Sequence, residues 1–330
     1  MSKNRVLAGH LVALMTMMIW GMTFVFTKVL LRSFSPVEIL VFRFMIGLFA
    51  LFLLNPRPLK LRSRSHEWYF AGIGLTGITL YFLLENIALT YTYASNVGVI
   101  TSLTPFFVAI CSHFILKDEK LTLRFLVGFL VAMVGILLIH INGTHALKLN
   151  PRGDILAILA GVVWGLYSVL VRILSRYHYN TLLVTRRGFT YGLLFMIPAI
   201  FLTDFKWDLA RLAQPQNLLN LLFLGLGASA LCFVSWNWAI KVLGVIRSSV
   251  YIYLGPVVAV IASALILSER ITPLAILGTI LTLAGLLISE LKNLPASRTH
   301  FRLSDGPSSQ NAPVGPEGVS SDRDATPPGC

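Results

Sequence analysis

The sequence predicts an all-α membrane protein of ten transmembrane helices, arranged as two five-helix inverted repeats. Three observations carry this prediction: the composition, the length of the apolar runs and an internal repeat. Of the 330 residues, 56% are hydrophobic and only 12% are charged, whereas a soluble domain carries about 25% charged residues. About 20 apolar residues cross the ~30 Å hydrocarbon layer as a helix. Runs of this kind predict spans at 9–31, 36–54, 68–90, 95–116, 122–141, 153–174, 181–203, 217–240, 247–267 and 273–291.

Local signals support the first span and the starts of the fifth and tenth. The first span follows Lys3 and Arg5 but lacks the small-residue cleavage site of a signal peptide, so we expect it to be retained. Thr122 and Thr272 precede the fifth and tenth spans as N-cap residues, and Pro273 takes a first helical position. Glycines seven residues apart favour close packing of these two spans outside the transport pathway. They are Gly128 and Gly135 in the fifth span, and Gly278 and Gly285 in the tenth.

The internal repeat relates the two halves of the chain by nearly constant offsets. Adding 151 to the residue number takes Pro105 to Pro256, and adding 150 takes Glu119 to Glu269. Equivalent positions elsewhere are Trp20/Trp164, Lys28/Arg172, Arg43/Arg187, Gly74/Gly225 and Asn86/Asn237. Such self-similarity marks a duplication, kept either for transport or for folding alone. Because five spans are an odd number, the second unit must enter the membrane from the opposite side, as in alternating-access carriers.

Domain limits and topology follow from these patterns. We expect one five-helix repeat at 1–142 and a second at 150–292. The Pro-, Ser- and Gly-rich residues 293–330 predict a disordered cytoplasmic tail. Lys and Arg are more frequent in the loops on the N-terminal side, so both termini are predicted to be cytoplasmic. In a bacterium the protein would lie in the inner membrane.

Charged side chains inside the spans are candidates for gates or coupling groups, because lipid penalises them unless they face a partner or a water-filled cavity. Near the outer side, Lys28 and Arg43 have the acids Glu38, Glu85 and Glu269 as expected partners. Near the inner side, the equivalent Arg172 and Arg187 have Asp118 and Glu119. The alternative is that Lys28 and Arg172 extend to the headgroups. The gate or coupling candidates are Lys28, Glu38, Glu85, His113 and Arg172.

Amides, prolines and aromatic rings recur on the same predicted helices. The amides of Asn86 and Asn237 can bond either a neighbouring helix or a ligand. Pro105 and Pro256 remove a backbone donor in the middle of a helix, either to line a cavity or only to bend the helix. The candidate substrate-pathway residues are Trp20, Phe24, Arg43, Tyr81, Asn86, Asn96, Thr101, Pro105, Trp164, Arg187, Asn237, Tyr251 and Pro256.

These motifs resemble those of the drug/metabolite transporter superfamily, in its ten-helix EamA-like branch. The resemblance covers about residues 8–290. It rests on the motifs Trp20-Gly21, Ala88-Leu89, Tyr91, Ala94-Ser95, Leu103-Thr104-Pro105, Glu119 and Leu121-Thr122, repeated in part at Gly255-Pro256, Glu269 and Ile271-Thr272. It implies a cavity between helices one to four and six to nine. Leu243, Val245 and Ile246 depart from the first-half motif, so the resemblance does not imply a two-fold symmetric cavity.

The function predicted from these observations is secondary transport. We expect alternating access that moves a small organic metabolite, an amino acid or similar, in the direction of export. A multidrug or cationic compound exporter of the same fold is the alternative. The chain has no Walker motif, so direct use of ATP is not expected. Coupling to a proton gradient through Glu85 or His113, and facilitated diffusion, both stay open.

Other classes of function are not favoured by the sequence. The net charge of +13 suggests a nucleic-acid partner, but the basic residues lie between apolar runs rather than on one face. An intramembrane enzyme would need converging catalytic groups, and the chain has no HExxH, no GxSxG and no pair of intramembrane aspartates. We therefore expect no enzymatic activity, no metal and no cofactor. The sequence does not indicate an oligomeric state.

Overall fold

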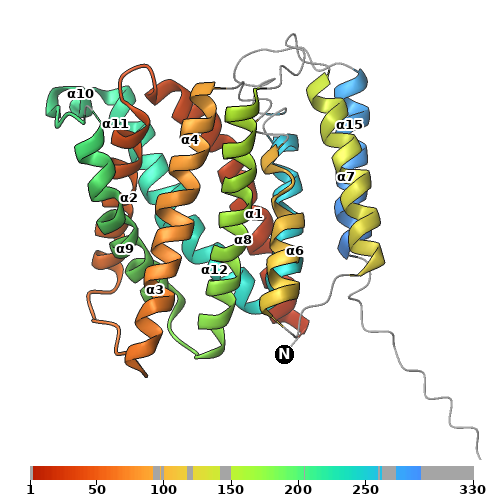
Figure 1. The fold of residues 1–330 in the computed structure, drawn as a ribbon, viewed down its shortest axis with the longest axis horizontal. Helices are drawn as coiled ribbons and strands as arrows, with labels where there is room; N and C mark the ends of the chain where they lie inside the picture. The colour runs from red at the N-terminus through yellow and green to blue at the C-terminus, as the bar shows by residue number, and fades with distance from the viewer. Residues whose placement is uncertain are drawn as a thin grey trace, which may run out of the picture. The chain divides into compact units, whose positions relative to one another are not determined.

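A computed structural model describes residues 3–91, 97, 100–116, 122–141, 150–203, 205–258, 261 and 273–290. Within these residues the chain is helical and contains no β-strand (Figure 1). Met1–Asn293 form one compact unit, and the remaining residues, where we predict a disordered tail, lie outside the described part. Five helical stretches are long and apolar enough to cross a membrane: Asn4–Thr23, Pro36–Leu54, Arg64–Ala88, Pro151–Arg176 and Pro215–Leu243. Shorter apolar helices cover Thr104–Ile115, Leu123–Leu138, Val245–Val258 and Ile276–Ser289.

The first half of the chain follows the predicted spans closely. Its helices are α1 (Lys3–Leu30), α2 (Pro36–Leu54), η1 (Arg64–His66), α3 (Glu67–Ile73), η2 (Gly74–Leu80), α4 (Tyr81–Tyr91), α6 (Thr104–Ile115) and α7 (Leu123–Ile141). Helix α2 begins with a capping box, in which the N–H of Glu38 donates to Ser35 Oγ and the N–H of Ser35 donates to Glu38 Oε2. Pro36 follows at a first-turn position, where its missing N–H costs nothing. The sequence therefore fixes the start of α2.

The second half has a similar order of elements, again with a π-helical segment in its third span. They are α8 (Pro151–Arg176), α9 (Thr181–Leu202), α10 (Leu209–Ala213), α11 (Pro215–Leu222), η3 (Phe223–Leu231), α12 (Cys232–Leu243), α13 (Val245–Val250), η4 (Tyr251–Tyr253) and α15 (Pro273–Glu290). Asn150 caps α8 by accepting from the N–H groups of Arg152 and Gly153, and Asn180 caps α9. Side-chain caps of this kind satisfy donors that a helix start leaves unpaired.

A π-helical segment interrupts the third span of each half at equivalent positions. These segments are η2 and η3, and the offset of 151 takes Gly74 to Gly225. Each packs against the second span of the other half. A Cβ atom placed on Gly74 would lie 2.7 Å from the carbonyl oxygen of Gly188 in α9, and one on Gly225 would lie 3.1 Å from that of Arg43 in α2. Segments of this type are frequent at functional sites.

Pro105 starts a helix rather than bending one, which corrects the expectation of a proline in mid-helix. Helix α6 begins at Thr104, directly after a turn at residues 102–103. In the second half, the 3-10 turn η4 precedes Leu254, from which helix continues through Pro256 to residue 258. Both prolines therefore lie within three residues of a helix start, where a missing N–H is tolerated. Broken helices of this kind are common around transporter binding sites.

Helices α7 and α15 pack against each other through their glycines, as the sequence predicts (Figure 1). A Cβ atom on Gly135 would lie 2.5 Å from the carbonyl oxygen of Gly278, and one on Gly285 would lie 2.5 Å from that of Gly128. The Thr282 hydroxyl donates to the carbonyl oxygen of Gly278 in the same helix at 2.8 Å. Small residues thus bring the two backbones into direct contact.

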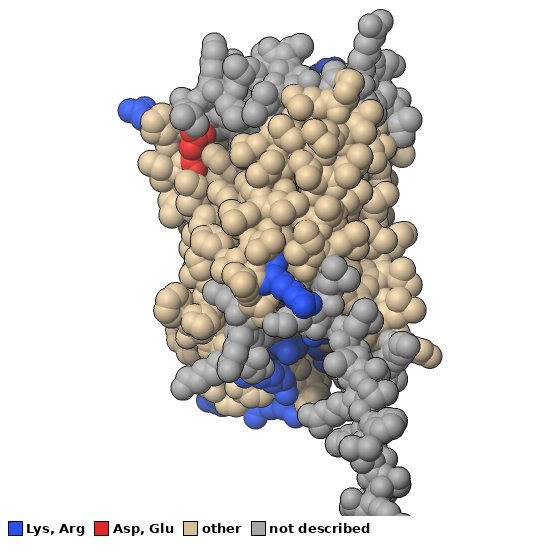
Figure 2. All heavy atoms as spheres, turned by 90° about the vertical axis from the view of Figure 1, so that its right-hand side faces the viewer, with Lys and Arg blue, Asp and Glu red and all other residues tan. Residues whose placement is uncertain are grey.

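The described surface is that of a protein surrounded by lipid. Large apolar side chains are widely exposed, including Phe49, Leu123, Phe201 and Leu202. Figure 2 shows a broad face with mostly uncharged side chains, and the coloured Lys and Arg side chains gather toward its lower end. A soluble monomer exposes such patches rarely, whereas a bilayer requires them.

Candidate functional site

Aromatic side chains from helices of both halves form one buried cluster. Its members, called the aromatic cluster below, are Trp20, Phe44, Tyr81, Phe82, Trp164, Tyr167, Phe189, Phe233 and Trp236. Trp20 of α1 lies at its centre, with ring centroids 5.6 Å from Trp164, 5.5 Å from Phe233 and 5.3 Å from Trp236. Tyr81 of α4 lies 4.7 Å from Trp164. The equivalent tryptophans 20 and 164 are therefore in contact.

The indole N–H groups of two tryptophans in this cluster differ from that of Trp20 in lacking a hydrogen-bond acceptor in the described part of the chain. Trp20 donates from Nε1 to the carbonyl oxygen of Ala228 at 2.8 Å. By contrast, Nε1 of Trp164 and Nε1 of Trp236 are buried without a hydrogen-bond partner among the described residues. A buried donor without a partner costs about 1–3 kcal/mol, so these two groups are suited to bind water or a polar ligand.

Arg43 is a buried cation beside the aromatic cluster. It is 5% exposed, and its Nε donates to Ser229 Oγ at 3.0 Å. Its guanidinium carbon lies 4.8 Å from the ring centroid of Phe82 and 5.1 Å from that of Phe44, in a cation–π arrangement. Ser229 belongs to the π-helical segment η3, so this contact joins the second span of one half to the third span of the other.

Glu85 of α4 is a buried acid next to Tyr81. It is 7% exposed and accepts a hydrogen bond from the Tyr81 hydroxyl at 3.1 Å. Arg43 and Glu85 are near enough for their charges to act on each other. Among the described residues, however, no nitrogen of Arg43 lies within 4.0 Å of an oxygen of Glu85. The expected direct pairing of Arg43 with Glu85 is therefore not formed.

The Asn237 side chain forms hydrogen bonds with two neighbouring helices. Its Oδ1 accepts from the Tyr167 hydroxyl at 2.6 Å, and its Nδ2 donates to Thr185 Oγ1 at 3.0 Å. These bonds connect α12 to α8 and α9 within the second half, as the helix-bonding interpretation predicts. Its equivalent Asn86 is buried in α4.

At the lower end in Figure 1, where α3 begins, an ion pair joins the two halves. Arg187 of α9 donates from Nε and Nη2 to the two carboxylate oxygens of Glu67, at 2.8 Å and 2.7 Å. The Tyr191 hydroxyl donates to the same carboxylate. This lower ion pair corrects the expectation that Arg187 meets Asp118 or Glu119, which lie outside the described residues. Paired geometry of this kind gives the strongest Arg–carboxylate contacts.

Arg172 donates to backbone carbonyl groups of a neighbouring helix. Its Nη1 donates to the carbonyl oxygens of Ile240 and Lys241, at 3.4 Å and 3.2 Å. These carbonyls lie in the last turn of α12, where a cation is favoured by the helix dipole. Arg172 thus connects α8 to α12 within the second half, while its expected partners Asp118 and Glu119 lie outside the described residues.

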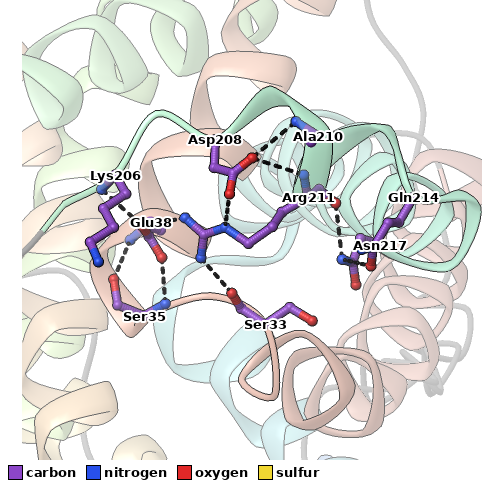
Figure 3. Close-up of polar contacts among 9 residues, drawn as sticks. All are labelled: Ser33, Ser35, Glu38, Lys206, Asp208, Ala210, Arg211, Gln214 and Asn217. Atoms are coloured by element: carbon purple, nitrogen blue, oxygen red, sulfur yellow. Dashed lines mark hydrogen bonds and ion pairs between the residues drawn. The ribbon is translucent and has the colours of Figure 1, made fainter.

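At the upper end in Figure 1, a second polar group joins the halves (Figure 3). Glu38 is 2% exposed, and its Oε1 accepts from the N–H of Lys206 at 2.9 Å and from Arg211 Nη2 at 3.3 Å. Arg211 also donates to the carbonyl oxygen of Ser33 at 2.7 Å and to Asp208 Oδ2 at 2.9 Å. Hydrogen bonds from the backbone and side chain of Arg211 lower the pKa of Asp208. This upper cluster corrects the expectation that Glu38 pairs with Lys28 or Arg43.

The structure places the other predicted site residues in different ways. His113 is exposed on α6 with its ring against Phe114, away from the aromatic cluster. The Tyr251 hydroxyl meets His10 Nδ1 at 2.7 Å and so connects η4 to α1. Thr101 and Pro256 are half-buried and Pro105 is buried. Asn96 and the side chains of Phe24 and Lys28 lie outside the described residues.

Sequence reasoning missed Glu67 and Arg211, the partners at the two ends. Both lie in segments that flank predicted spans, where charged residues are ordinary, so no local signal marked them. It also missed Phe44 and Phe189, because a phenylalanine in an apolar helix is indistinguishable from one that faces lipid. The sequence carries no information on which of these contacts form across the two halves.

The helical spans, apolar surface and buried polar groups define a multi-pass integral membrane protein. The model of the EamA-like transporter family matches residues 7–141 and again 151–291. The chain belongs to this family, which is part of the drug/metabolite transporter superfamily.

Comparisons with individual proteins agree with this assignment. An "Uncharacterized transporter" of Archaeoglobus fulgidus is 29% identical over 86% of this chain and 97% of its own length. A "Probable terminal-alkyne amino-acid exporter" of Streptantibioticus cattleyicolor is 27% identical over 86% of this chain and 94% of its own. A solved structure titled only "Crystal structure of protein" superposes with a TM-score of 0.70 at 20% identity, covering 88% of this chain and 98% of that one. The last likeness concerns the fold alone.

Proposed function

We propose that this transporter moves a small organic metabolite, an amino acid or similar, by alternating access and in the direction of export. One observation carries the proposal: Arg43 and the aromatic cluster combine side chains from α1, α2 and α4 with others from α8, α9 and α12. A site built from both halves changes its exposure when the halves move against each other. Trp20, Arg43, Tyr81, Glu85, Trp164 and Trp236 are its proposed central residues.

The proposed topology is ten spans in two inverted repeats, at 1–142 and 150–292, with both termini in the cytoplasm. Support comes from the two family matches and from the π-helical segments at equivalent positions in the third spans. The basic side chains gathered at the lower end of Figure 2 support a cytoplasmic lower end. The disordered tail at 293–330 remains part of this proposal.

The lower ion pair and the upper cluster are the proposed gates. Glu67 and Arg187 lie at one end of the molecule, and Glu38 and Arg211 at the other, and each pair connects one half to the other half. Alternating access requires the contacts at one end to open while those at the other end stay closed. These gates keep Glu38 and Arg187 from the charged clusters expected in the sequence and give them Arg211 and Glu67 as partners.

Substrate class separates this proposal from the alternative of a cationic drug exporter. The buried cation Arg43 would repel a cationic drug, and its cost is offset only when an anionic group binds beside it. The relative named as a probable amino-acid exporter also favours an amino acid, at 27% identity. A proton gradient remains the proposed driving force, with buried Glu85 as the group that would couple to it.

The test is retention of labelled solutes in cells that overproduce the protein, with and without a protonophore. The panel contains amino acids, nucleotides and cationic dyes, and an empty-vector strain is the control. Accelerated loss of amino acids, abolished by the protonophore, is expected. Loss of dyes alone would instead establish the drug exporter. Unchanged retention of every solute would contradict the proposed transport function.

A further inference from the structure

The repeat leaves Arg43 without the acid that its equivalent has. Arg187 is bound by Glu67 at 2.8 Å and 2.7 Å. The offset of 144 relates Arg187 to Arg43, and the offset of 151 that relates Gly74 to Gly225 takes Glu67 to Leu218. The second half therefore supplies an apolar residue where the first half supplies a carboxylate.

Most of the donor capacity of Arg43 is consequently unused. A guanidinium carries five N–H donors, and the hydrogen bond to Ser229 uses only the one on Nε. The described residues provide no partner for Nη1 or Nη2. Although the residue is only 5% exposed, its Nη atoms are not among the fully enclosed polar atoms that lack a partner, so a ligand can reach them. A buried cation with four unused donors is suited to a carboxylate.

Glu85 supplies the opposite charge next to the same group of rings. Tyr81 donates to one oxygen of Glu85 and lies 4.7 Å from the ring of Trp164. Phe82, over which Arg43 lies, is 4.9 Å from the ring of Tyr81. The cation and the acid thus border one group of aromatic rings without neutralising each other directly.

We infer that Arg43 and Glu85 together recognise a zwitterion, which places the substrate among α-amino acids with an apolar or aromatic side chain. Arg43 binds the carboxylate and Glu85 binds the ammonium, whose charge is also favoured by the neighbouring ring faces. The aromatic cluster receives the apolar side chain. A purely anionic solute leaves Glu85 uncompensated, and a purely cationic solute leaves Arg43 uncompensated. The inference rests on the proposed transport function and specifies its substrate.

Three compounds that share one aromatic ring test the inference. They are L-phenylalanine, its decarboxylated analogue phenethylamine and its deaminated analogue 3-phenylpropanoate. The full-length protein is reconstituted in proteoliposomes that contain unlabelled phenylalanine, and each compound competes against uptake of labelled phenylalanine. Losing a charge-assisted hydrogen bond costs about 1.5–3 kcal/mol. Each analogue is therefore expected to compete at least about tenfold more weakly than phenylalanine.

Single substitutions test which residue binds the carboxylate of the substrate and which binds its ammonium group. In Arg43→Gln the advantage of phenylalanine over phenethylamine should disappear, and in Glu85→Gln its advantage over 3-phenylpropanoate should disappear. Arg187→Gln is the matched control, because it removes the equivalent arginine and should keep the order of the three compounds.

The order in which the three compounds compete in the wild-type protein tests the inference even if a variant does not fold. Equal competition by either analogue would overturn the inference. Exchange of nucleotides or cationic dyes without phenylalanine exchange would also overturn it while leaving the transport function intact. Exchange of no member of the panel would count against the transport function itself.

Discussion

Arg187 and Glu67 join the two halves through a pair of parallel hydrogen bonds, while Arg43, the equivalent of Arg187, has Ser229 as its one hydrogen-bond partner in the described part of the chain. The same residue type thus has two roles in one fold. One arginine is neutralised at an end of the molecule, and the other is left charged beside the aromatic rings.

Loss of the lower ion pair should slow transport more than it weakens the fold. Both side chains are partly exposed, at 32% and 27%, so Glu67→Gln should change stability by only about 1 kcal/mol or less. Its transport rate should fall, because the lower end no longer closes with the same contact. The exchange of charges in a Glu67→Arg, Arg187→Glu double variant should recover part of the rate. A double variant no faster than the single variants would disprove the gate role.

Glu38 should matter more for stability than its neighbour Asp208. Glu38 is buried and accepts from Ser35, Lys206 and Arg211, so Glu38→Leu should cost about 1–3 kcal/mol through unsatisfied donors. Asp208→Asn is the control and should cost less, because the Asp208 side chain is 43% exposed. Thermal unfolding in detergent measures both. Equal shifts of the two melting temperatures would show that the upper cluster does not depend on Glu38.

Acid should weaken the Asp208 contact in a defined direction. Its pKa is lowered in the folded protein, mainly by the backbone N–H of Arg211. The contribution of Asp208 to stability is therefore present above the ordinary carboxyl pKa and is lost as the pH falls through its lower folded value. The wild-type protein should therefore lose stability as the pH falls below about 4. The Asp208→Asn variant should lack this part of the pH dependence of its unfolding free energy. An unchanged profile in this variant would refute the assignment.

The contact between α7 and α15 should not tolerate a larger residue. A Cβ atom on Gly135 would lie 2.5 Å from backbone atoms of α15, so Gly135→Leu should destabilise the protein by at least about 1–3 kcal/mol through overpacking. Gly255→Ala is the control, because a Cβ atom there meets nothing within 4 Å. Thermal unfolding of the two variants compares them directly. Similar melting temperatures would mean that α7 and α15 can separate without cost.

The extent of the helices could be predicted from sequence because apolar run length and capping residues act locally. The start of α2 at Pro36 and the packing of Gly135 against α15 are examples. The identity of charge partners could not be predicted. Whether Glu38 meets Arg43 or Arg211 depends on how the linker after α9 folds over α2, which is a long-range contact. Offsets in the repeat indicated equivalent positions but not equivalent partners.

The reciprocal packing of the π-helical segments has a consequence for how the chain holds together. Each half inserts its third span against the second span of the other, through Gly74 on one side and Gly225 on the other. Neither half completes its own packing. Two polypeptides ending at residue 141 and starting at residue 150 should consequently assemble with each other in the membrane, and each should be degraded when produced alone. The two halves therefore behave like the subunits of a heterodimer joined by a linker. The linker at residues 142–149 keeps the halves close together, but the packed helices hold them to each other.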